Sequence, residues 1–212
     1  MSVIRQRGRP RDPVKDRQIL EAAVALFMER GFAASSMEAI AEQAGVSKVT
    51  LYARYKDKES LFIAALAMRT NEFVGPELFE PGVGGGVRAQ LSLIASRFLQ
   101  LVISHDGVGM MVLISKESAR SPQLAALFFD MAVLPLKRHI EAFLMREAAA
   151  GRLIIADPDG AAWRFLGAVK GKAHLCAMLG LAVPEAAELQ RHLDACVDDF
   201  LRLHAGPNLG EA

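Results

Sequence analysis

Apolar residues recur at three- and four-residue spacing along almost the whole chain, and no stretch longer than a few residues alternates apolar with polar side chains. That period places apolar side chains on one face of an α-helix, whereas a half-buried strand needs a period of two. Because 52% of the 212 residues are hydrophobic, the chain can also bury a sizeable core. The sequence therefore predicts an all-α globular fold.

Capping residues and helix breakers divide this pattern into about nine helices. Asp12-Pro13 begins the first helix and Gly31 ends it, while Ser36, Ser47 and Asp57 are placed to cap the next three. The expected helices cover residues 13–30, 37–43, 48–55, 58–73, 87–104, 107–119, 122–150, 158–180 and 185–205. Pro135 falls inside the long 122–150 pattern, where the lost backbone hydrogen bond should kink or split the helix.

Gly75-Pro76 and the run Pro81–Gly86 form the clearest linker in the sequence. No Gly-Lys-Ser/Thr motif follows this run and no strand precedes it, so we interpret it as a hinge or loop and not as a phosphate-binding loop. A length of 212 residues suits one large domain or two small ones, and we favour two compact units.

Composition and terminal sequence bear on the compartment. The longest stretch without Asp, Glu, Lys or Arg, residues 173–184, is shorter than a membrane span, and no apolar signal-peptide segment follows the basic N-terminus. Cys176 and Cys196 are too few for a disulfide framework or a four-ligand zinc site. We therefore expect a cytoplasmic protein that makes no membrane contact.

Residues that could carry catalysis or bind a metal are sparse. His174 and Cys176 lie two apart, which on a helix directs them to different faces. The five histidines form no HExxH motif and no di-iron ExxH pair, and no nucleophile elbow is present. His105 beside Asp106 is interpreted as a capping or surface pair, with a base in a pocket as the alternative. We expect no enzyme activity, no metal site and no cofactor.

The N-terminus carries a basic arm. Arg5, Arg7, Arg9 and Arg11 are clustered, and no acidic residue comes before Asp12. An arm of this kind can reach a phosphate backbone or a narrow minor groove. A solvated tail is the alternative that the arm alone leaves open.

Residues 31–61 match a helix-turn-helix. Two short helices are separated by Ala44-Gly45-Val46, and Ile40, Ala41, Val46 and Leu51 face the core. The first residues of the second helix can then meet base edges in a major groove. The predicted DNA-binding residues, including the arm, are Arg7, Arg9, Arg11, Ser36, Ser47, Lys48, Val49, Thr50, Tyr52, Ala53, Arg54, Tyr55 and Lys58.

Side-chain chemistry divides these residues between bases and phosphates. Lys48 and Arg54 can donate to guanine, while Val49 and Ala53 can touch a thymine methyl group. The hydroxyls of Thr50, Tyr52 and Tyr55 and the ammonium of Lys58 suit phosphates. Packing remains open for Tyr52, as does an ordinary solvated position for Lys48.

The same segment resembles the DNA-binding domain of the TetR/AcrR family of bacterial transcriptional regulators. The resemblance is carried by Gly31-Phe32, Ser35-Ser36, Ile40-Ala41, Ala44-Gly45-Val46-Ser47, Thr50-Leu51-Tyr52, Tyr55, Lys58-Glu59 and Leu61. Tyr55 stands where the family usually has Phe. The resemblance implies that Thr50, Tyr52 and Lys58 hold phosphates and that Lys48, Val49, Ala53 and Arg54 face bases.

Residues 114–171 are similar in layout to the AefR-like C-terminal domains of this family. The resemblance implies a DNA-binding head over 1–56 and a ligand-binding and dimerisation bundle over 57–212, with the fourth helix connecting them. It further implies a homodimeric repressor that a small effector releases from a palindromic double-stranded operator.

Met and Phe residues near Pro135 suggest where such an effector could bind. We expect an apolar cavity lined from among Phe98, Leu101, Met110, Phe128, Met131 and Phe165. Because Lys137 and Arg138 are expected to face solvent, the effector should be neutral or weakly polar. A fully packed core is the alternative.

The last two expected helices carry apolar faces that could pair between two copies. The predicted dimer residues are Trp163, Leu166, Val169, Leu189, Leu193, Cys196, Val197 and Phe200. The alternative is that these residues complete the core of one chain.

Two rival functions remain at this stage. One is a DNA-binding protein of the same fold that senses no small molecule. The other is a helical bundle that binds or transforms a small molecule, with an incidental helix-turn-helix. Salt-dependent binding to duplex DNA separates the second rival from both regulators.

Overall fold

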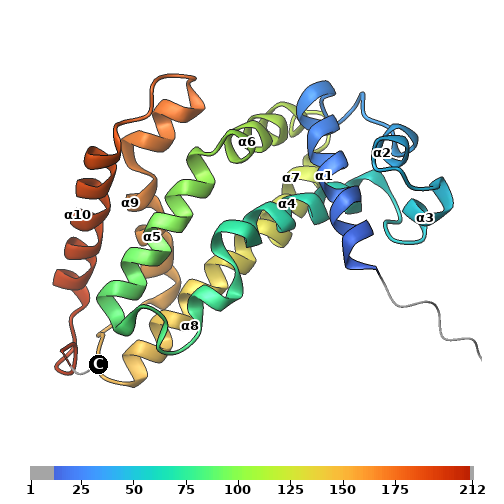
Figure 1. Ribbon diagram of the computed structural model, residues 1–212. Coiled ribbons are helices and arrows are strands. Elements are labelled where there is room, and N and C mark those ends of the chain that lie inside the picture. The colour runs from blue at the N-terminus through green and yellow to red at the C-terminus, as the bar shows by residue number, and fades with distance from the viewer. Residues whose placement is uncertain (1–11, 211–212) are drawn as a thin grey trace, which may run out of the picture. The chain divides into compact units, whose positions relative to one another are not determined.

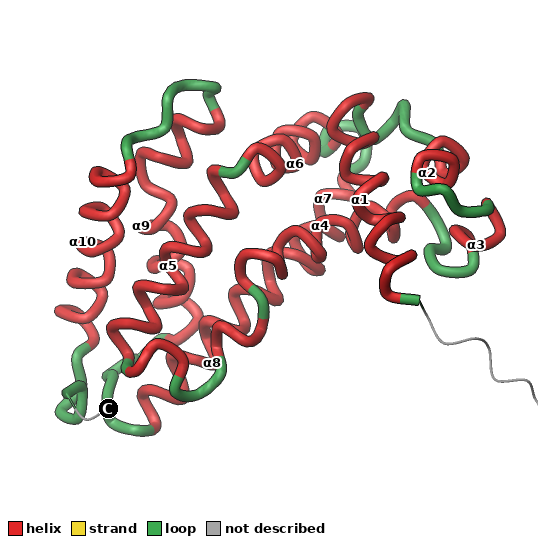
Figure 2. Tube along the Cα trace, in the orientation of Figure 1, coloured by secondary structure: helices red, strands yellow, loops and turns green. Residues whose placement is uncertain are grey.

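The computed structural model describes residues 12–210, so the predicted DNA contacts of Arg7, Arg9 and Arg11 lie outside the described residues. These residues form α-helices joined by loops and short turns, and no strand occurs among them (Figures 1 and 2). The all-α prediction is confirmed. Over the same range no single helix combines the length and apolar composition of a membrane span, although α5 (Val87–Ile103) and α6 (His105–Glu117) together, bent by 60°, meet both criteria.

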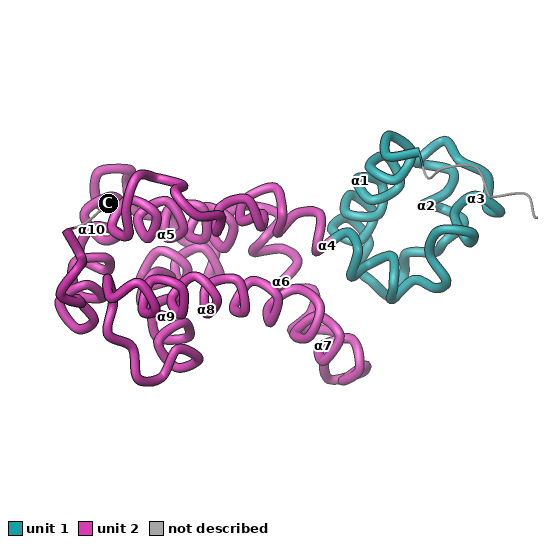
Figure 3. Tube along the Cα trace, turned by 90° about the horizontal axis from the view of Figure 1, so that it is seen from below, with its two compact units in different colours: residues 1–65 teal, residues 66–212 magenta. Residues whose placement is uncertain are grey.

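The chain divides into two compact units after Ala65 (Figure 3). The described part of the first contains α1 (Pro13–Arg30), α2 (Met37–Gln43), α3 (Lys48–Tyr52) and the start of α4 (Lys58–Val74). The caps that the sequence suggests are present: Asp12, Ser36 and Ser47 each accept a hydrogen bond from a backbone amide two or three residues ahead.

An aromatic cluster forms the centre of the first unit. The ring of Phe62 meets Phe27 edge-on at 5.1 Å and Phe32 at 5.2 Å between centroids. Since Phe62 lies on α4, the first turns of α4 belong to this core. This packing explains why the units divide within α4, whereas the sequence suggested a boundary between residues 56 and 57.

The second unit is a helical bundle. Its remaining helices are α5 (Val87–Ile103), α6 (His105–Glu117), α7 (Pro122–Phe128), α8 (Leu134–Ala149), α9 (Pro158–Met178) and α10 (Ala186–His204). Figure 1 shows α5, α9 and α10 side by side, and these three helices pack on one another while α8 packs on α9. The core lies between these four helices.

The long helix expected over 122–150 is interrupted, as Pro135 suggested. A π-helical turn, Phe129–Val133, separates α7 from α8, and the amide of Leu134 donates to the carbonyl of Phe129, five residues back. Proline lacks an amide hydrogen, and its ring clashes with the carbonyl four residues earlier in a regular helix. The wider turn removes that clash and leaves Pro135 in the first turn of α8.

The Gly- and Pro-rich segment before α5 forms two 3₁₀ turns, Pro76–Phe79 and Val83–Gly85. The side-chain amide of Gln90 donates to the carbonyls of Leu78 (3.0 Å) and Glu80 (3.1 Å). Phe79 is buried in the core of the bundle. The segment predicted as a hinge or loop is therefore a loop anchored to the bundle.

Candidate functional site

The first candidate site is the outer face of α3. A tight turn joins α2 to α3, and Gly45 adopts φ +65°, a left-handed conformation that glycine tolerates without strain. Ile40 and Leu51 are fully buried on the inner side, as predicted. This packing fixes which side of the five-residue helix faces outward.

Several predicted DNA-binding residues lie on that outer face. The side chain of Val49 is 80% exposed and that of Tyr52 48%. Ser47, Lys48 and Ala53 are also exposed. Lys48 makes only a surface ion pair, 3.7 Å from Glu38, and such pairs are weak enough to exchange for another partner. The face combines hydroxyl, ammonium and apolar groups, which are the groups that contact DNA backbones and base edges.

The hydroxyls near the start of α3 are linked to one another. Ser47 Oγ accepts from the amide of Thr50 and lies 2.8 Å from Thr50 Oγ1. Thr50 is half-buried, as is Tyr55. Ser36 caps α2 through the amide of Ala39.

Arg54, which the sequence predicts to face bases, is engaged within the first unit in the structure. Its guanidinium pairs with the carboxylate of Asp16 and donates to the carbonyl of Asp12, 3.3 Å away, and only 14% of the side chain is exposed. Both partners lie at the start of α1. Arg54 therefore ties the end of α3 to α1, a long-range contact that helical periodicity does not reveal.

Lys58 is also placed differently from the expectation. Its ammonium donates to the carbonyls of Phe32 (2.7 Å), Ala33 (3.2 Å) and Ser35 (2.9 Å), and lies 4.6 Å from the centre of the Phe32 ring. A lysine has three donors, and all three are used here. In the structure Lys58 holds the loop before α2, and a contact with a phosphate would require it to give up one of these carbonyls.

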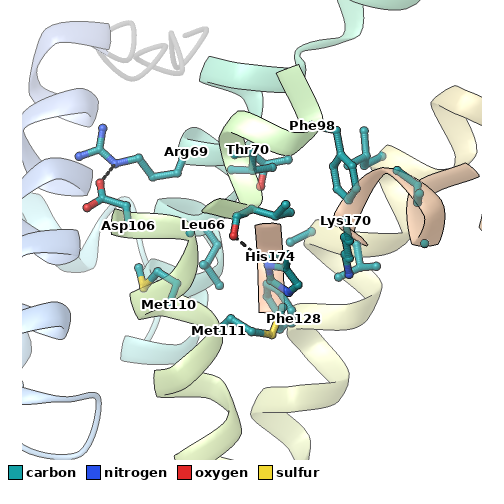
Figure 4. A pocket seen from close by; sticks show the side chains of 18 of the residues that line it. Leu66, Arg69, Thr70, Phe98, Asp106, Met110, Met111, Phe128, Lys170 and His174 are labelled. Atoms are coloured by element: carbon teal, nitrogen blue, oxygen red, sulfur yellow. Dashed lines mark hydrogen bonds and ion pairs between the residues drawn. The ribbon is translucent and has the colours of Figure 1, made fainter. Parts of the chain in front are cut away.

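The second candidate site is a cavity of about 180 Å³ within the second unit. Four of the six predicted cavity residues, Phe98, Leu101, Met110 and Phe128, line it (Figure 4). Leu66, Arg69 and Thr70 of α4 form one wall, and Trp163, Leu166, Gly167, Lys170 and His174 of α9 form another. The alternative to a cavity, a fully packed core, therefore does not describe this region.

Two predicted lining residues lie elsewhere. Met131 is 55% exposed and borders only a smaller cavity of about 30 Å³. It belongs to the π turn, whose extra residue changes the direction of the side chains that follow. Phe165 is buried against Phe200, 5.2 Å between ring centroids, because on α9 it faces α10 and not the cavity.

Charged residues in the cavity wall contradict the expectation of a purely apolar site. Arg69 Nε lies 2.9 Å from Asp106 Oδ2 (Figure 4). Arg69 Nη1 also pairs with Glu72 at 2.8 Å. Asp106 thus lines the cavity instead of forming a capping or surface pair with His105. Lys137, expected to face solvent, is 6% exposed and pairs with Glu141 and Asp159, away from the cavity.

Lys170 and His174 complete the polar part of the cavity. Burial lowers the pKa of Lys170. Burial also lowers the pKa of His174, with a smaller contribution from the charge of Lys170, while the bond to the Val102 carbonyl opposes the shift. Sequence reasoning missed both residues. Their spacing of four, in phase with the apolar residues Trp163 and Leu166 on one face of the helix, is the signal that could have found them.

The predicted dimer residues belong mostly to the core of one chain. Six of them are no more than 9% exposed within the single chain: Leu166, Val169, Leu193, Cys196, Val197 and Phe200. Leu189 is half-buried against the same core, and Trp163 stacks on Phe129 at 6.0 Å beside the cavity. The six buried side chains are unavailable to a second copy, so for them the structure supports the alternative assignment to the core, whereas Trp163 remains 37% exposed.

In the described range 12–210, no three His, Cys, Asp or Glu side chains are grouped so that they could hold a metal ion.

Comparison with known proteins divides the chain in the same way. The model described as "Bacterial regulatory proteins, tetR family" matches residues 19–65. The model described as "AefR-like transcriptional repressor, C-terminal domain" matches residues 89–205. The first covers the helix-turn-helix and the second covers the bundle.

Similar curated proteins include the HTH-type transcriptional activator FasR of Mycolicibacterium smegmatis, 32% identical over 117 residues (55% of this chain and 52% of FasR). The fatty acid metabolism regulator protein of Bacillus subtilis is 32% identical over 95 residues, or 44% of this chain and 48% of that protein. The chain thus spans about half the length of the curated relatives it matches.

Two solved structures match nearly the whole chain. A Mesorhizobium loti protein described as a TetR-family transcriptional regulator has a TM-score of 0.77 and 27% identity, covering 93% of this chain and 100% of that one. The flavonoid-responsive regulator FrrA has a TM-score of 0.72 and 33% identity, covering 92% and 98%. Because family models match both units and cover more than half of its residues, the chain belongs to the TetR family of bacterial DNA-binding transcriptional regulators.

Proposed function

We propose that the protein binds a pseudo-palindromic operator as a homodimer, with α3 of each copy in a major groove, and that a small molecule in the cavity changes its affinity for DNA. The observation that carries this proposal is the course of α4. Its start supplies Phe62 to the core of the first unit, and its later turns supply Leu66, Arg69 and Thr70 to the cavity wall.

The exposed residues of α3 suit a duplex. A valine that is 80% exposed gains nothing from water, but its methyl groups can pack on a thymine methyl group in the major groove. Lys48 can exchange its weak surface pair for guanine, and the hydroxyls of Thr50 and Tyr52 can donate to phosphates. Arg54 and Lys58 are omitted from this contact set because Arg54 Nη1 and the Lys58 ammonium are engaged within the chain.

The cavity could control DNA binding through α4. The Arg69–Asp106 pair joins α4 to α6 at the cavity wall. A ligand that fits one arrangement of this wall better than another shifts the population of the two, by no more than its difference in affinity for them.

We infer repression as the sign of regulation, because the matched C-terminal model is described as that of a repressor. FasR is called an activator, so the sign is a separate question from DNA binding. The description of FrrA as flavonoid-responsive supports control by a small molecule in a protein of this shape.

Exposed leucines at the end of α9 offer a surface for dimerisation. Leu175, Leu179 and Leu181 are each at least 59% exposed in the single chain, and Val183 follows them. Exposed apolar side chains so close in sequence favour contact with another protein surface. A dimer formed here would replace the interface that the sequence suggested.

Selection of bound duplexes from a random pool tests DNA recognition. We expect a salt-sensitive complex with a two-fold symmetric sequence, weakened for all duplexes by Tyr52→Ala. Lys48→Ala should relax preference at one position per half-site by about 1 to 3 kcal/mol. Val14→Ala, at an exposed position on α1, is the matched control and should change neither the affinity for duplex DNA nor the base preference. Absence of a salt-sensitive complex with any duplex would overturn the proposal.

A further inference from the structure

Lys170 is a half-buried lysine in a largely apolar cavity. Neither the packing of the bundle described above nor the proposed DNA contacts use its charge. Within the described part of the chain its ammonium pairs with no carboxylate. Its nearest recorded partner is the ring of Phe98, with 5.9 Å between Nζ and the ring centre. Burial lowers the pKa of Lys170, as expected for an ammonium without an anionic partner.

The other charged groups of the cavity are already matched. Asp106 and Glu72 both pair with Arg69, so neither carboxylate is spare for Lys170. Arg69 is thus matched by two carboxylates, and Lys170 is the lining cation for which the described residues offer none. The part of the cavity beside Lys170 therefore carries an unpaired positive charge, which favours an anionic ligand over a cationic one.

His174 adds a hydrogen-bond acceptor beside this charge. Its Nδ1 lies 3.0 Å from the carbonyl oxygen of Val102, an atom that can only accept, so Nδ1 carries the proton. With its pKa lowered below the ordinary 6.5, the ring is neutral at neutral pH and Nε2 keeps a lone pair. The cation near the ligand is thus Lys170 alone on α9.

The size of the cavity limits the ligand. A volume of about 180 Å³ is slightly larger than the roughly 150 Å³ of a cavity that holds benzene, so the enclosed part of the ligand is about one ring with its substituents. Phe98, Phe128 and Trp163 supply aromatic surface for such a body, and Met110 and Met111 supply deformable surface (Figure 4).

We propose that the cavity binds a compact apolar molecule with one acidic group, a carboxylate, sulfonate or phenolate, and that Lys170 Nζ pairs with that group. This inference rests on the proposed role of the cavity as a ligand site. It adds to that role the chemical class of the ligand and the residue that selects it. The charged hydrogen bond, shielded from water, should make the acidic ligand bind more tightly than a neutral analogue, because the neutral analogue leaves the ammonium unpaired.

Two fluorescent probes that differ only in the acidic group test the proposal. Anilinonaphthalene sulfonate is an anion, and phenylnaphthylamine is its uncharged parent. Titrated into the full chain, the sulfonate should bind at least about tenfold more tightly than the parent. Lys170→Met should abolish this preference by weakening the sulfonate and leaving the parent within about twofold.

Matched variants separate the site from its surroundings. Lys172→Met removes an exposed lysine from the same helix and should leave both affinities unchanged. Lys170→Arg should keep the preference for the anion, and guards against misfolding of the methionine variant. Gly167→Trp should weaken both probes, because a side chain at Gly167 meets open space at the cavity wall.

The outcomes for this proposal and for the proposed function differ. An unchanged ratio of the two affinities in Lys170→Met, or an equal loss of both, would overturn the assignment of Lys170 and indicate a lysine that merely extends its ammonium to solvent. A probe preference that follows Lys170 while duplex affinity ignores the bound sulfonate would uphold the anion site and contradict the regulatory role of the cavity.

Discussion

Two partly buried lysines, one in each unit, differ in the partners of their ammonium groups. Lys58 spends all three donors on carbonyls of its own unit, whereas Lys170 sits half-buried in a cavity without a carboxylate partner in the described chain. Nothing about the residue type distinguishes them. A lysine with all its donors engaged holds a fold together, and an unpaired one is available to a ligand.

The same contrast applies to the two sites. The first unit closes around Phe27, Phe32 and Phe62 and exposes the outer face of α3, as recognition of a long polymer requires. The second unit opens internally, between α4, α5, α6 and α9, which suits a small molecule. Substitution of individual side chains distinguishes those that stabilise the fold from those that bind a partner.

The largest effect should follow Phe62→Ala. Because Phe62 is fully buried between two other rings, the substitution should lower the free energy of unfolding of the first unit by about 3 to 5 kcal/mol. Chemical denaturation followed by circular dichroism measures this loss. Leu203→Ala, at a position 77% exposed, should cost almost nothing, and an equal loss in both variants would contradict the proposed core.

The next largest effect should follow Lys58→Met, which should lower the free energy of unfolding of the first unit by about 2 kcal/mol, because it leaves three loop carbonyls without their charged donor. Lys56→Met, at an exposed position, is the control. The slope of duplex affinity against salt distinguishes the two assignments of Lys58. It should stay unchanged in folded Lys58→Met protein, whereas a reduction of about 0.9 would indicate a lost phosphate contact.

Arg54 and Asp16 should be coupled by about 1 kcal/mol in a double-mutant cycle on unfolding, because the pair is only partly buried. Arg54→Ala should leave the base preference of the selected operator intact. If Arg54→Ala relaxes the base preference at one position of each half-site, and Arg54 and Asp16 show no coupling in the free energy of unfolding, then Arg54 contacts DNA.

The smallest effect should follow Asp57→Ala, which removes the carboxylate that accepts from the Ser60 amide at 2.8 Å and should cost about 1 kcal/mol. This bond lowers the pKa of Asp57 from 3.8. Its stabilisation should therefore be complete above pH 3.8 and disappear as the pH falls through the lowered value. Denaturation of wild type and variant should differ at neutral pH and converge in strong acid; a difference that persists there would contradict the assignment.

The elements of this fold are largely readable from local sequence signals. Caps at Asp12, Ser36 and Ser47 and the break at Pro135 all act within a few residues, so their positions follow from residue type and spacing. The exposed residues of α3 follow from the same local pattern.

The partners of the charged groups were not readable, because they depend on contacts far apart in sequence. Arg54 meets Asp16 across 38 positions and Lys58 meets Phe32 across 26. Burial of Phe200 and Leu193 against their own chain likewise depends on how α5, α9 and α10 pack, since a core face and a dimer face have the same apolar period. The extra residue of the π turn, which directs Met131 outward, leaves no clear sequence signal of its own.

The central claim is that occupancy of the cavity and binding of DNA are coupled, and linkage makes this coupling measurable from either side. The most direct measurement is the affinity of anilinonaphthalene sulfonate for the full chain, alone and saturated with the selected duplex. The account predicts that the duplex weakens sulfonate binding by the same factor by which the sulfonate weakens duplex binding. Identical sulfonate affinities with and without the duplex would contradict it.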